Sequence, residues 1–289
     1  MSDNITMETP PATELIDLAI NGAVATLNLA RPDKYNAMNT QLINELIQLL
    51  DWTAERSVGR TGTTTDPNGC EFLRVLVVGG GESKHFCAGA DINMMRDAGA
   101  KSAEENRIDS ERLDRLFNGL WAHPCFTIGT VQGVALGGGA GLIACIDYVI
   151  AASGTKIALS EGKLGILPAV IGPYVYRRVG SANFRRLAMQ ASRIETEEAL
   201  RIGMIDQVSD EQASALTEII DKVMTTGPVA VSTAKELSIG LERWNLQMDE
   251  ELREWTLDFT SKMRGSDEGQ EGLSAFLESR NPNWYPSDD

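Results

Sequence analysis

The chain has 289 residues, of which 43% are apolar, and its 26 Lys and Arg against 41 Asp and Glu give a formal charge of −15. This excess of acidic residues argues against nucleic acid as a partner, because phosphate binding depends on clustered Lys and Arg. The apolar runs fall short of the ~18 residues that a membrane helix needs, and the 4 cysteines lack the CxxC spacing of a zinc site. We therefore expect a cytoplasmic protein with no membrane segment and no metal.

The N-terminal part of the chain predicts a tail, a hairpin and a helix. Residues 1–12 are polar, contain two prolines and lack the basic-then-apolar pattern of an export signal, so we expect a disordered tail. Two strands are predicted at Glu14–Ile20 and Ala23–Leu29, where Asn21-Gly22 can supply the positive φ angles of a tight turn. Asn39 can then cap a long amphipathic helix.

Three later segments are continuous apolar runs of the kind that form strands buried on both faces. They are Arg74–Gly79, Phe126–Val131 and Tyr148–Ala152. Because strands and helices alternate up to about residue 205, we expect an α/β core over residues 13–207. Residues 208–289 should form an all-helical C-terminal region. Its predicted helices are Glu211–Thr225, Pro228–Gln247, Met248–Met263 and Glu268–Ser279.

Glycine triplets recur at Gly79–Gly81 and Gly137–Gly139, but neither has the spacing of a dinucleotide-binding motif or a P-loop. The second triplet leads into Ala140–Ile146, which is typical of a buried helix. Free N–H groups at the start of such a helix can hold an anion when no side chain stands in the way. A tight strand-to-helix turn without chemistry fits the residues equally well.

The segment Phe86-Cys-Ala-Gly-Ala-Asp91 follows the strand that ends at Gly79, and its amide groups could face the same point as the glycine turn. Together the two segments resemble the crotonase family, the enoyl-CoA hydratase/isomerase superfamily. The resemblance covers nearly the whole chain from Glu14 onward. It includes Arg31–Met38, Phe86–Ile92, Gln132–Gly139, Ser160–Gly165 and Ser266–Trp284.

The resemblance implies a crotonase-like ββα spiral core whose C-terminal helices complete the coenzyme A site, and assembly as a homotrimer or homohexamer. It also implies an acyl-CoA thioester as substrate, with coenzyme A carried by the substrate and no further cofactor. By position, Ala90 and Gly138 would supply the two backbone N–H groups of an oxyanion hole for the thioester enolate. Each such donor is typically worth ~3–4 kcal/mol of barrier.

One departure from the family pattern bears on the reaction. Hydratases of the family carry two glutamates that hold and activate water. The second aligns with Glu161, whereas Gly141 stands where the first would be. Glu161 lies among apolar and glycine residues, where burial would raise its pKa into a range useful for proton transfer. A surface or salt-bridging glutamate is the alternative.

Three reactions are compatible with a single carboxylate. Hydration or dehydration of a branched or carboxylated acyl-CoA is one, and Δ3,Δ2-enoyl-CoA isomerisation, a proton shuttle that needs one base, is another. A decarboxylation or ring-forming branch of the family fits less well, because that branch often loses both glutamates. A non-catalytic scaffold that binds coenzyme A or RNA stays open as a function of another class.

The acyl group is indicated by the run Leu159–Tyr174, which is similar to methylglutaconyl-CoA hydratases of leucine breakdown and isohexenylglutaconyl-CoA hydratases of terpene breakdown. Within it, Ala169 and its neighbour are bulky enough to reshape the acyl pocket, and Gly141 would make room there. Such substrates carry a second carboxylate, for which Lys163 and Arg96 are the candidate cations. A solvated surface charge is the alternative for each.

The motifs imply further substrate contacts. Lys34 matches a position where the family tends to place a cation near the coenzyme phosphates, and Phe276 matches one that packs on the acyl-carrier arm or the adenine. The alternatives are a solvated lysine and an ordinary core residue. The oxyanion motif also adds candidates for substrate binding, which are Ala88, Asp91 and Ile92.

Overall fold

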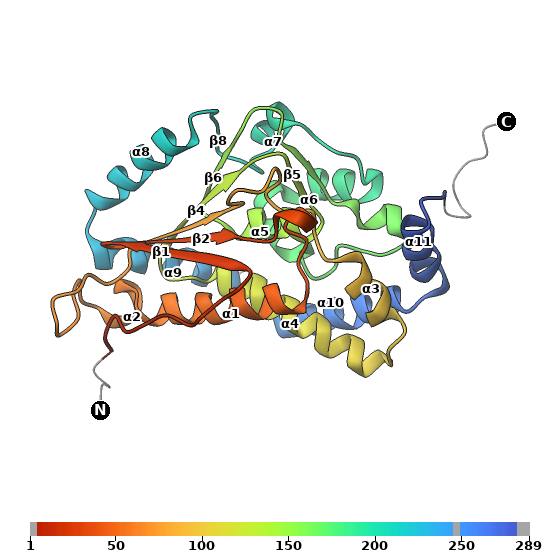
Figure 1. The fold of residues 1–289 in the computed structure, drawn as a ribbon, viewed down its shortest axis with the longest axis horizontal. Coiled ribbons are helices and arrows are strands. Elements are labelled where there is room, and N and C mark those ends of the chain that lie inside the picture. The colour runs from red at the N-terminus through yellow and green to blue at the C-terminus, as the bar shows by residue number, and fades with distance from the viewer. Residues whose placement is uncertain (1–4, 245–248, 282–289) are drawn as a thin grey trace.

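The computed structural model describes residues 5–244 and 249–281 of the chain. Within these residues a six-stranded sheet has the order β1-β2-β3-β4-β6-β8, and β5 and β7 form a second, two-stranded sheet (Figure 1). The strands are β1 (Ile16–Asn21), β2 (Val24–Leu29), β3 (Val75–Gly79), β4 (Phe126–Val131), β5 (Val134–Leu136), β6 (Tyr148–Ala151), β7 (Lys156–Ala158) and β8 (Gln207–Val208).

The helices confirm the prediction of an α/β core followed by helices, because α8 to α11 all come after β8. The α-helices are α1 (Thr40–Glu55), α2 (Val58–Thr61), α3 (Ile92–Gly99), α4 (Ala103–Trp121), α5 (Gly138–Cys145), α6 (Gly172–Gln190), α7 (Thr196–Arg201), α8 (Gln212–Met224), α9 (Pro228–Trp244), α10 (Asp249–Arg264) and α11 (Asp267–Leu277). Two short 3-10 helices are η1 (Pro32–Lys34) and η2 (Ser160–Leu164). Across the described ranges, none of these helices is long and apolar enough to cross a membrane.

The N-terminal hairpin follows the expected turn chemistry. Strands β1 and β2 pair antiparallel, and Gly22 in their connection has a φ of 54°. From β2 onward, neighbouring strands of the sheet pair in parallel. Parallel strands need crossover connections, and these crossovers place helices on both faces of the sheet.

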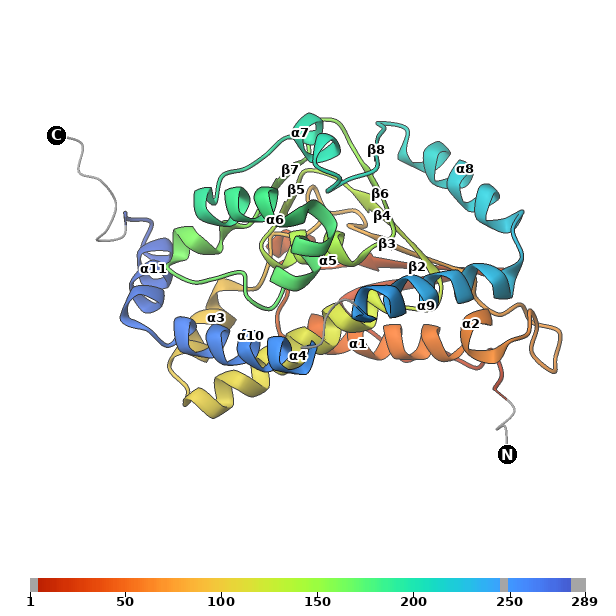
Figure 2. The same cartoon turned by 180° about the vertical axis from the view of Figure 1, so that it is seen from behind.

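Strand β3 shows how the two faces of the sheet are used. All of its residues are buried, and alternate side chains point to opposite faces. Leu76 and Val78 belong to the main core together with residues of α1 and α4, whereas Val75 and Val77 pack against α8. Figures 1 and 2 show α8 on one side of the sheet and α1, α4 and α9 on the other.

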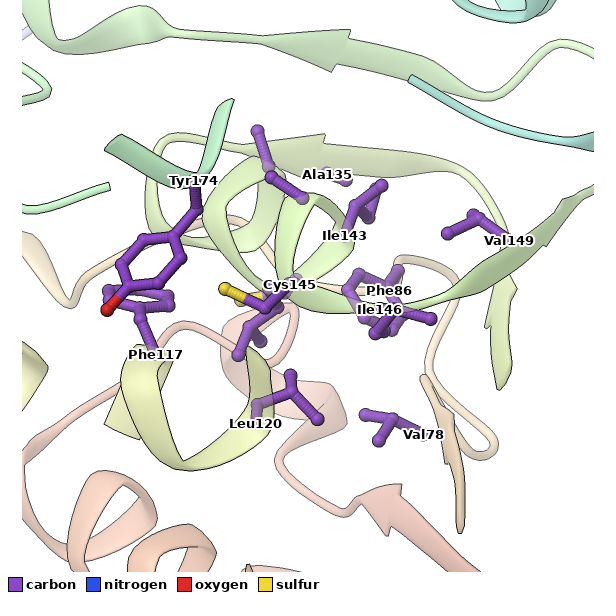
Figure 3. Close-up of a cluster of buried hydrophobic side chains, with 14 of the residues drawn as sticks. Val78, Phe86, Phe117, Leu120, Ala135, Ile143, Cys145, Ile146, Val149 and Tyr174 are labelled. Carbon is purple, nitrogen blue, oxygen red and sulfur yellow. The ribbon is translucent and has the colours of Figure 1, made fainter. Parts of the chain in front are cut away.

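Helix α5 is an apolar helix in the middle of the molecule. Its residues from Gly139 to Cys145 are all buried. Figure 3 shows Phe117 and Leu120 of α4 and Tyr174 of α6 gathered around Cys145. Because both neighbouring helices pack against it, the start of α5 is held in a fixed position relative to the sheet.

The C-terminal helices fold back over the α/β core. On α9, Lys235 Nζ donates to Asp147 Oδ2 at 2.7 Å and to the Cys125 carbonyl at 3.1 Å. Helix α10 lies along α4, where Arg253 Nε donates to Asp114 at 2.9 Å. Helix α11 packs against α3 and η2, so the last helices reach the segments that follow β3 and β7.

The N-terminal segment contacts the core from Thr6 onward, although residues 5–12 have no regular secondary structure. The Met7 N–H donates to Asp66 at 3.0 Å, and the Thr6 carbonyl accepts from Arg56 at 3.0 Å. Several expectations fall outside the described residues. These are residues 1–4 of the tail, the helix junction at Gln247–Met248 and Pro282–Trp284 of the C-terminal motif.

Asn36 ties the loop after β2 to the loop after β3. Its side chain has 0% exposure, and Nδ2 donates to the carbonyls of Gly80, His85 and Phe86 at 3.0–3.1 Å. Its Oδ1 accepts from the Arg31 N–H at 2.9 Å. The amide therefore supplies the hydrogen bonds that hold two otherwise irregular segments together.

Replacing Asn36 by Ala should lower the free energy of unfolding by about 2–4 kcal/mol, because it leaves buried carbonyl oxygens without a donor. Urea denaturation followed by circular dichroism measures this change. Asn44→Ala, at an exposed position of α1, is the matched control and should stay within about 0.5 kcal/mol of the wild type. A loss below about 1 kcal/mol for Asn36→Ala would contradict the role given to the amide.

Candidate active site

The turn after β3 leaves a backbone N–H group without a partner. Met38 pairs with both sides of this turn: its N–H donates to the Gly89 carbonyl at 2.7 Å, and its carbonyl accepts from the Asp91 N–H at 2.9 Å. Ala90 lies between these two bonds, and its own N–H donates to no other residue of the described chain. The N–H expected to face an oxyanion is therefore available.

A second such N–H stands at the start of α5. Gly137 has φ 50° and ψ −116°, and its own N–H donates to the Ala158 carbonyl at 2.9 Å. Gly138 is the first residue of α5, where N–H groups have no acceptor within the helix. No other acceptor for it occurs in residues 5–244 and 249–281. An atom at the Cβ position of Gly138 would lie 3.8 Å from the Ala90 nitrogen, so the two N–H groups are neighbours.

The two turns come this close because Gly89 has no side chain. Its φ of 98° is a conformation that side-chain-bearing residues rarely adopt. A Cβ at this position would lie 2.8 Å from the Leu136 carbonyl oxygen and 3.7 Å from the Gly138 nitrogen. Any larger residue here would therefore push the turn away from the start of α5.

Asp91, expected to bind substrate, caps α3 and does not line a cavity with the other site residues. Its Oδ1 accepts from the Asn93 N–H at 3.0 Å, and Arg31 Nη1 lies 2.8 Å from its Oδ2. Burial opposes ionisation, but the hydrogen bond from Arg31 keeps the pKa of Asp91 below its ordinary value. The pair fixes the turn to the loop after β2.

Glu161 lies in η2, facing the glycine turn. Its Oε1 is 3.1 Å from the position that a Cβ on Gly137 would take. Its Oε2 is buried and has no hydrogen-bond partner in the part of the chain that the structure describes. Burial, opposed by a backbone hydrogen bond of the residue itself, raises the pKa of the Glu161 carboxyl to about 7. The carboxyl can therefore accept and release a proton near neutral pH.

A cavity of about 60 Å³ joins these groups, and most of its wall is apolar. The lining residues are Met38, Ala90, Met95, Leu113, Phe117, Gly138, Glu161, Ile166, Leu167, Pro168, Ala169, Val170, Ile171 and Arg264. Ala90, Gly138 and Glu161 thus share one cavity, although they come from three separate segments of the chain. The arrangement offers two hydrogen-bond donors and one proton carrier to a small apolar space.

Ala169 and the adjoining Val170 lie in the cavity wall, whereas Ala88, Asp91 and Ile92, the candidates for substrate binding in the oxyanion motif, do not. The Ala88 N–H donates to the Tyr35 carbonyl at 3.0 Å. Ile92 packs instead against the small cluster that contains Met95. Both residues support the turn from outside the cavity.

The cations expected near the substrate lie on the surface. Lys34, Arg96 and Lys163 are exposed, and Arg96 pairs with Asp97 at 2.9 Å. Phe276 is 60% exposed on α11, so the alternative of an ordinary core residue is wrong for this chain. Coenzyme binding by Lys34 and Phe276 stays a prediction.

The space expected beside Gly141 is already occupied. A Cβ at this position would lie 2.4 Å from Cγ2 of Ile171 and 3.0 Å from Cε1 of Phe117. Gly141 itself is buried within α5 and does not line the cavity. The expectation that it makes room for the acyl group is therefore wrong, because Ile171 and Phe117 fill that space and form the cavity wall there.

Arg264 is a cavity residue that sequence reasoning missed. It is the last residue of α10, it is 4% exposed, and it lines the same cavity as Glu161. A basic residue in the last turn of a helix is typical of a solvated C-terminal end. Its sequence context therefore carries no signal of burial.

Neither histidine lines the cavity. His123 is buried beside Thr53, with 3.0 Å between Nε2 and Oγ1, and burial lowers its pKa to about 3. Burial also lowers the pKa of His85. A histidine-based mechanism therefore finds no support at this site. Nor do the described residues contain a group of three or more His, Cys, Asp and Glu that could hold a metal ion.

Comparisons with known proteins find relatives over nearly the whole chain. The profile of the enoyl-CoA hydratase/isomerase family matches residues 19–287. An enoyl-CoA hydratase from Shewanella pealeana has a similar structure, with 35% identity and a TM-score of 0.72 over 94% of this chain and 96% of that one. AtuE of Pseudomonas aeruginosa has 34% identity and a TM-score of 0.71 over 94% and 99%. Crotonyl-CoA hydratase of Syntrophomonas wolfei is 30% identical over 94% of this chain and 98% of its own length.

Gly141→Ala should lower the free energy of unfolding by about 1–3 kcal/mol, because the added methyl group collides with Ile171 and Phe117. Chemical denaturation measures this change. Gly119→Ala on α4 is the matched control: its Cβ would lie 3.8 Å from Leu50 Cδ1, an ordinary contact, so stability should stay unchanged or rise by up to about 1 kcal/mol. If the two substitutions changed the free energy of unfolding equally, the conclusion that the space beside Gly141 is filled would be contradicted.

Glu161→Gln should stabilise the protein in a pH-dependent way. The carboxyl ionises near 4.5 in the unfolded chain but at about 7 in the folded protein, so wild-type stability falls as pH rises through this interval. The glutamine variant should gain less than about 1 kcal/mol over the wild type at pH 5, and up to about 3 kcal/mol at pH 8. Urea titrations at both pH values test this, with the exposed Glu197→Gln of α7 as control. A gain that does not depend on pH would show that the folded-state carboxyl ionises normally.

Proposed function

This chain belongs to the enoyl-CoA hydratase/isomerase family, which acts on acyl-CoA thioesters, and we propose that it is a lyase that adds water to the 2,3-double bond of its substrate or removes it. The proposed substrate is a short, branched or carboxylated acyl-CoA such as 3-methylglutaconyl-CoA. One observation carries the proposal: in the part of the chain that the structure describes, one carboxyl with a buried oxygen and a pKa of about 7 shares a cavity with two N–H groups that have no partner there.

The Ala90 and Gly138 N–H groups would bind the thioester carbonyl oxygen. This oxygen becomes negative when the enolate forms, and donors that already point at it stabilise the charge without reorganising. Pairing with Met38 holds the Ala90 N–H in place, and packing around α5 holds the Gly138 N–H. The apolar wall lowers the local dielectric, which strengthens both hydrogen bonds.

Glu161 would carry one proton between water and C2 of the acyl group. In hydration, the carboxylate takes a proton from water as the water oxygen bonds to C3, and the double-bond electrons move onto the thioester as an enolate. The carboxylic acid then gives the same proton to C2, and the carboxylate is restored. Dehydration is the reverse sequence. A carboxyl with a pKa of about 7 suits both halves of this transfer near neutral pH.

Isomerisation is the second candidate, because one carboxylate suffices to move a proton between C4 and C2. Among the described residues, Glu161 is the only carboxylate in the cavity wall, and this observation favours an isomerase as much as a hydratase. The relatives named above as enoyl-CoA and crotonyl-CoA hydratases support hydration. A non-catalytic scaffold would leave unexplained why an unpaired carboxyl is buried beside two free N–H groups.

The cavity favours a short acyl group. Its volume is about 60 Å³. One water-sized group needs roughly 10–15 Å³ of such space, so the cavity holds several of them. The run from Leu167 to Ile171 forms much of the wall, and side chains such as Val170 narrow the space.

The rest of the proposal concerns the coenzyme and the assembly. Lys34 and the exposed Phe276 would contact the coenzyme A part of the substrate, and no further cofactor is needed for the proton transfer described. A cytoplasmic homotrimer or homohexamer is the proposed form of the enzyme, with the C-terminal helices completing the coenzyme site.

The hydratase should convert 3-methylglutaconyl-CoA with a higher kcat/KM than crotonyl-CoA, and Glu161→Gln should lower turnover by about 10²–10⁴-fold. Loss of the ultraviolet absorbance of the conjugated thioester measures hydration. Glu197→Gln should keep wild-type activity. A straight-chain 3-enoyl-CoA completes the panel, and migration of its double bond without hydration of the other two would identify an isomerase. Equal turnover of the two hydration substrates would contradict the proposed acyl group.

A further inference from the structure

The cavity wall contains a cation that no residue of the described chain neutralises. Arg264 ends α10, is 4% exposed and lines the cavity, and its Nε has no hydrogen-bond partner in residues 5–244 and 249–281. Figure 2 shows α10 beside α4, with α3 and α11 at its C-terminal end. Arg264 shares the cavity wall with Met95 of α3 and with Leu113 and Phe117 of α4.

The carboxylate that acts on Arg264 is already paired with other cations. Asp109 is the carboxylate whose charge reaches Arg264, and it is bound by Lys101 at 2.8 Å and by Arg112 at 2.9 Å. No ion pair to Arg264 occurs within the described ranges. Burial lowers the pKa of the Arg264 guanidinium, which reflects the unfavourable free energy of keeping this charge away from water. Such a residue is expected where a ligand supplies the missing partner.

Glu161 is not that partner, although it lines the same cavity. Burial and its own backbone hydrogen bond account for the pKa of Glu161, and burial and Asp109 account for that of Arg264. No ion pair joins the two side chains in residues 5–244 and 249–281, where Glu161 Oε2 and Arg264 Nε both lack a hydrogen-bond partner. The cavity thus has a proton carrier in one place and an unpaired cation in another.

We infer that Arg264 binds a carboxylate at the far end of the acyl group, so that the enzyme prefers coenzyme A thioesters of dicarboxylic acids. A guanidinium matches a carboxylate because its parallel N–H groups can donate to both oxygens. The inference rests on the proposed function only in placing the acyl group in this cavity. It replaces Arg96 and Lys163 as the expected cations, because both are exposed and neither lines the cavity.

This contact would also position the reacting carbons. The thioester oxygen would be held at the Ala90 and Gly138 N–H groups, and the far carboxylate at Arg264. An acyl group fixed at both ends keeps C2 and C3 in one place beside Glu161. Holding reacting atoms in this way contributes directly to rate.

The test uses two saturated thioesters of equal length, glutaryl-CoA and pentanoyl-CoA, which differ in the terminal carboxylate and can be neither hydrated nor isomerised. Isothermal titration should show that the wild type binds glutaryl-CoA about 10–100-fold more tightly than pentanoyl-CoA. Arg264→Met should remove this preference and leave pentanoyl-CoA binding unchanged or tighter. Arg264→Lys should retain part of it, because the charge remains but the paired donors are lost. Arg96→Met, at the exposed arginine of α3, should bind both thioesters like the wild type.

Each outcome decides the inference separately from the proposed reaction. The role of Arg264 would be overturned if the wild type bound glutaryl-CoA and pentanoyl-CoA equally well. It would also be overturned if only Arg96→Met lost the preference for glutaryl-CoA. Neither outcome would contradict the hydration of enoyl-CoA. Equal weakening of both thioesters in Arg264→Met would show that the residue only supports the fold. A preference that depends on Arg264 would sustain the inference even if turnover assays identified an isomerase.

Discussion

The site depends on the close approach of two backbone turns. The turn that carries Ala90 can lie against the start of α5 only because Gly89 has no Cβ to meet the Leu136 carbonyl. Hydrogen bonds on the outer side of the turn hold it in place, among them those of the Asn36 amide and those between Met38 and the turn. The position of the two free N–H groups follows from it, and so does the place where a thioester oxygen can sit.

Around this contact the protein keeps two ionisable groups without partners. Glu161 Oε2 and Arg264 Nε are both buried and unpaired in the described chain. Each destabilises the folded state, and the apolar packing around α5 has to offset this. A carboxylate and a guanidinium that could pair would stabilise each other, but such a pair would serve neither proton transfer nor recognition. Their separation therefore indicates that function, rather than stability, determines what lines the cavity.

The features that follow from local signals can be predicted from the sequence. Gly22 in the hairpin and Asn39, whose side chain accepts from the Leu42 N–H at 2.9 Å, are examples. Ala90, Gly138 and Glu161 can also be located, because each lies in a segment that resembles a motif of the family. The surroundings of Gly141 cannot, since they depend on Ile171 arriving from another segment. The burial of Arg264 likewise depends on how α10 packs.

The cavity takes its wall from both early and late parts of the chain. Ala90 and Gly138 precede α8, whereas Arg264 ends α10, and Leu273 of α11 packs beside Met95 and Ile166. Contacts between segments so distant in sequence form late, because they require the closure of long loops. While the chain is being synthesised, the turns that stabilise an enolate can therefore be in place before Arg264 joins the wall. In the order of synthesis, the residues of the chemistry precede the arginine inferred to select the acyl group.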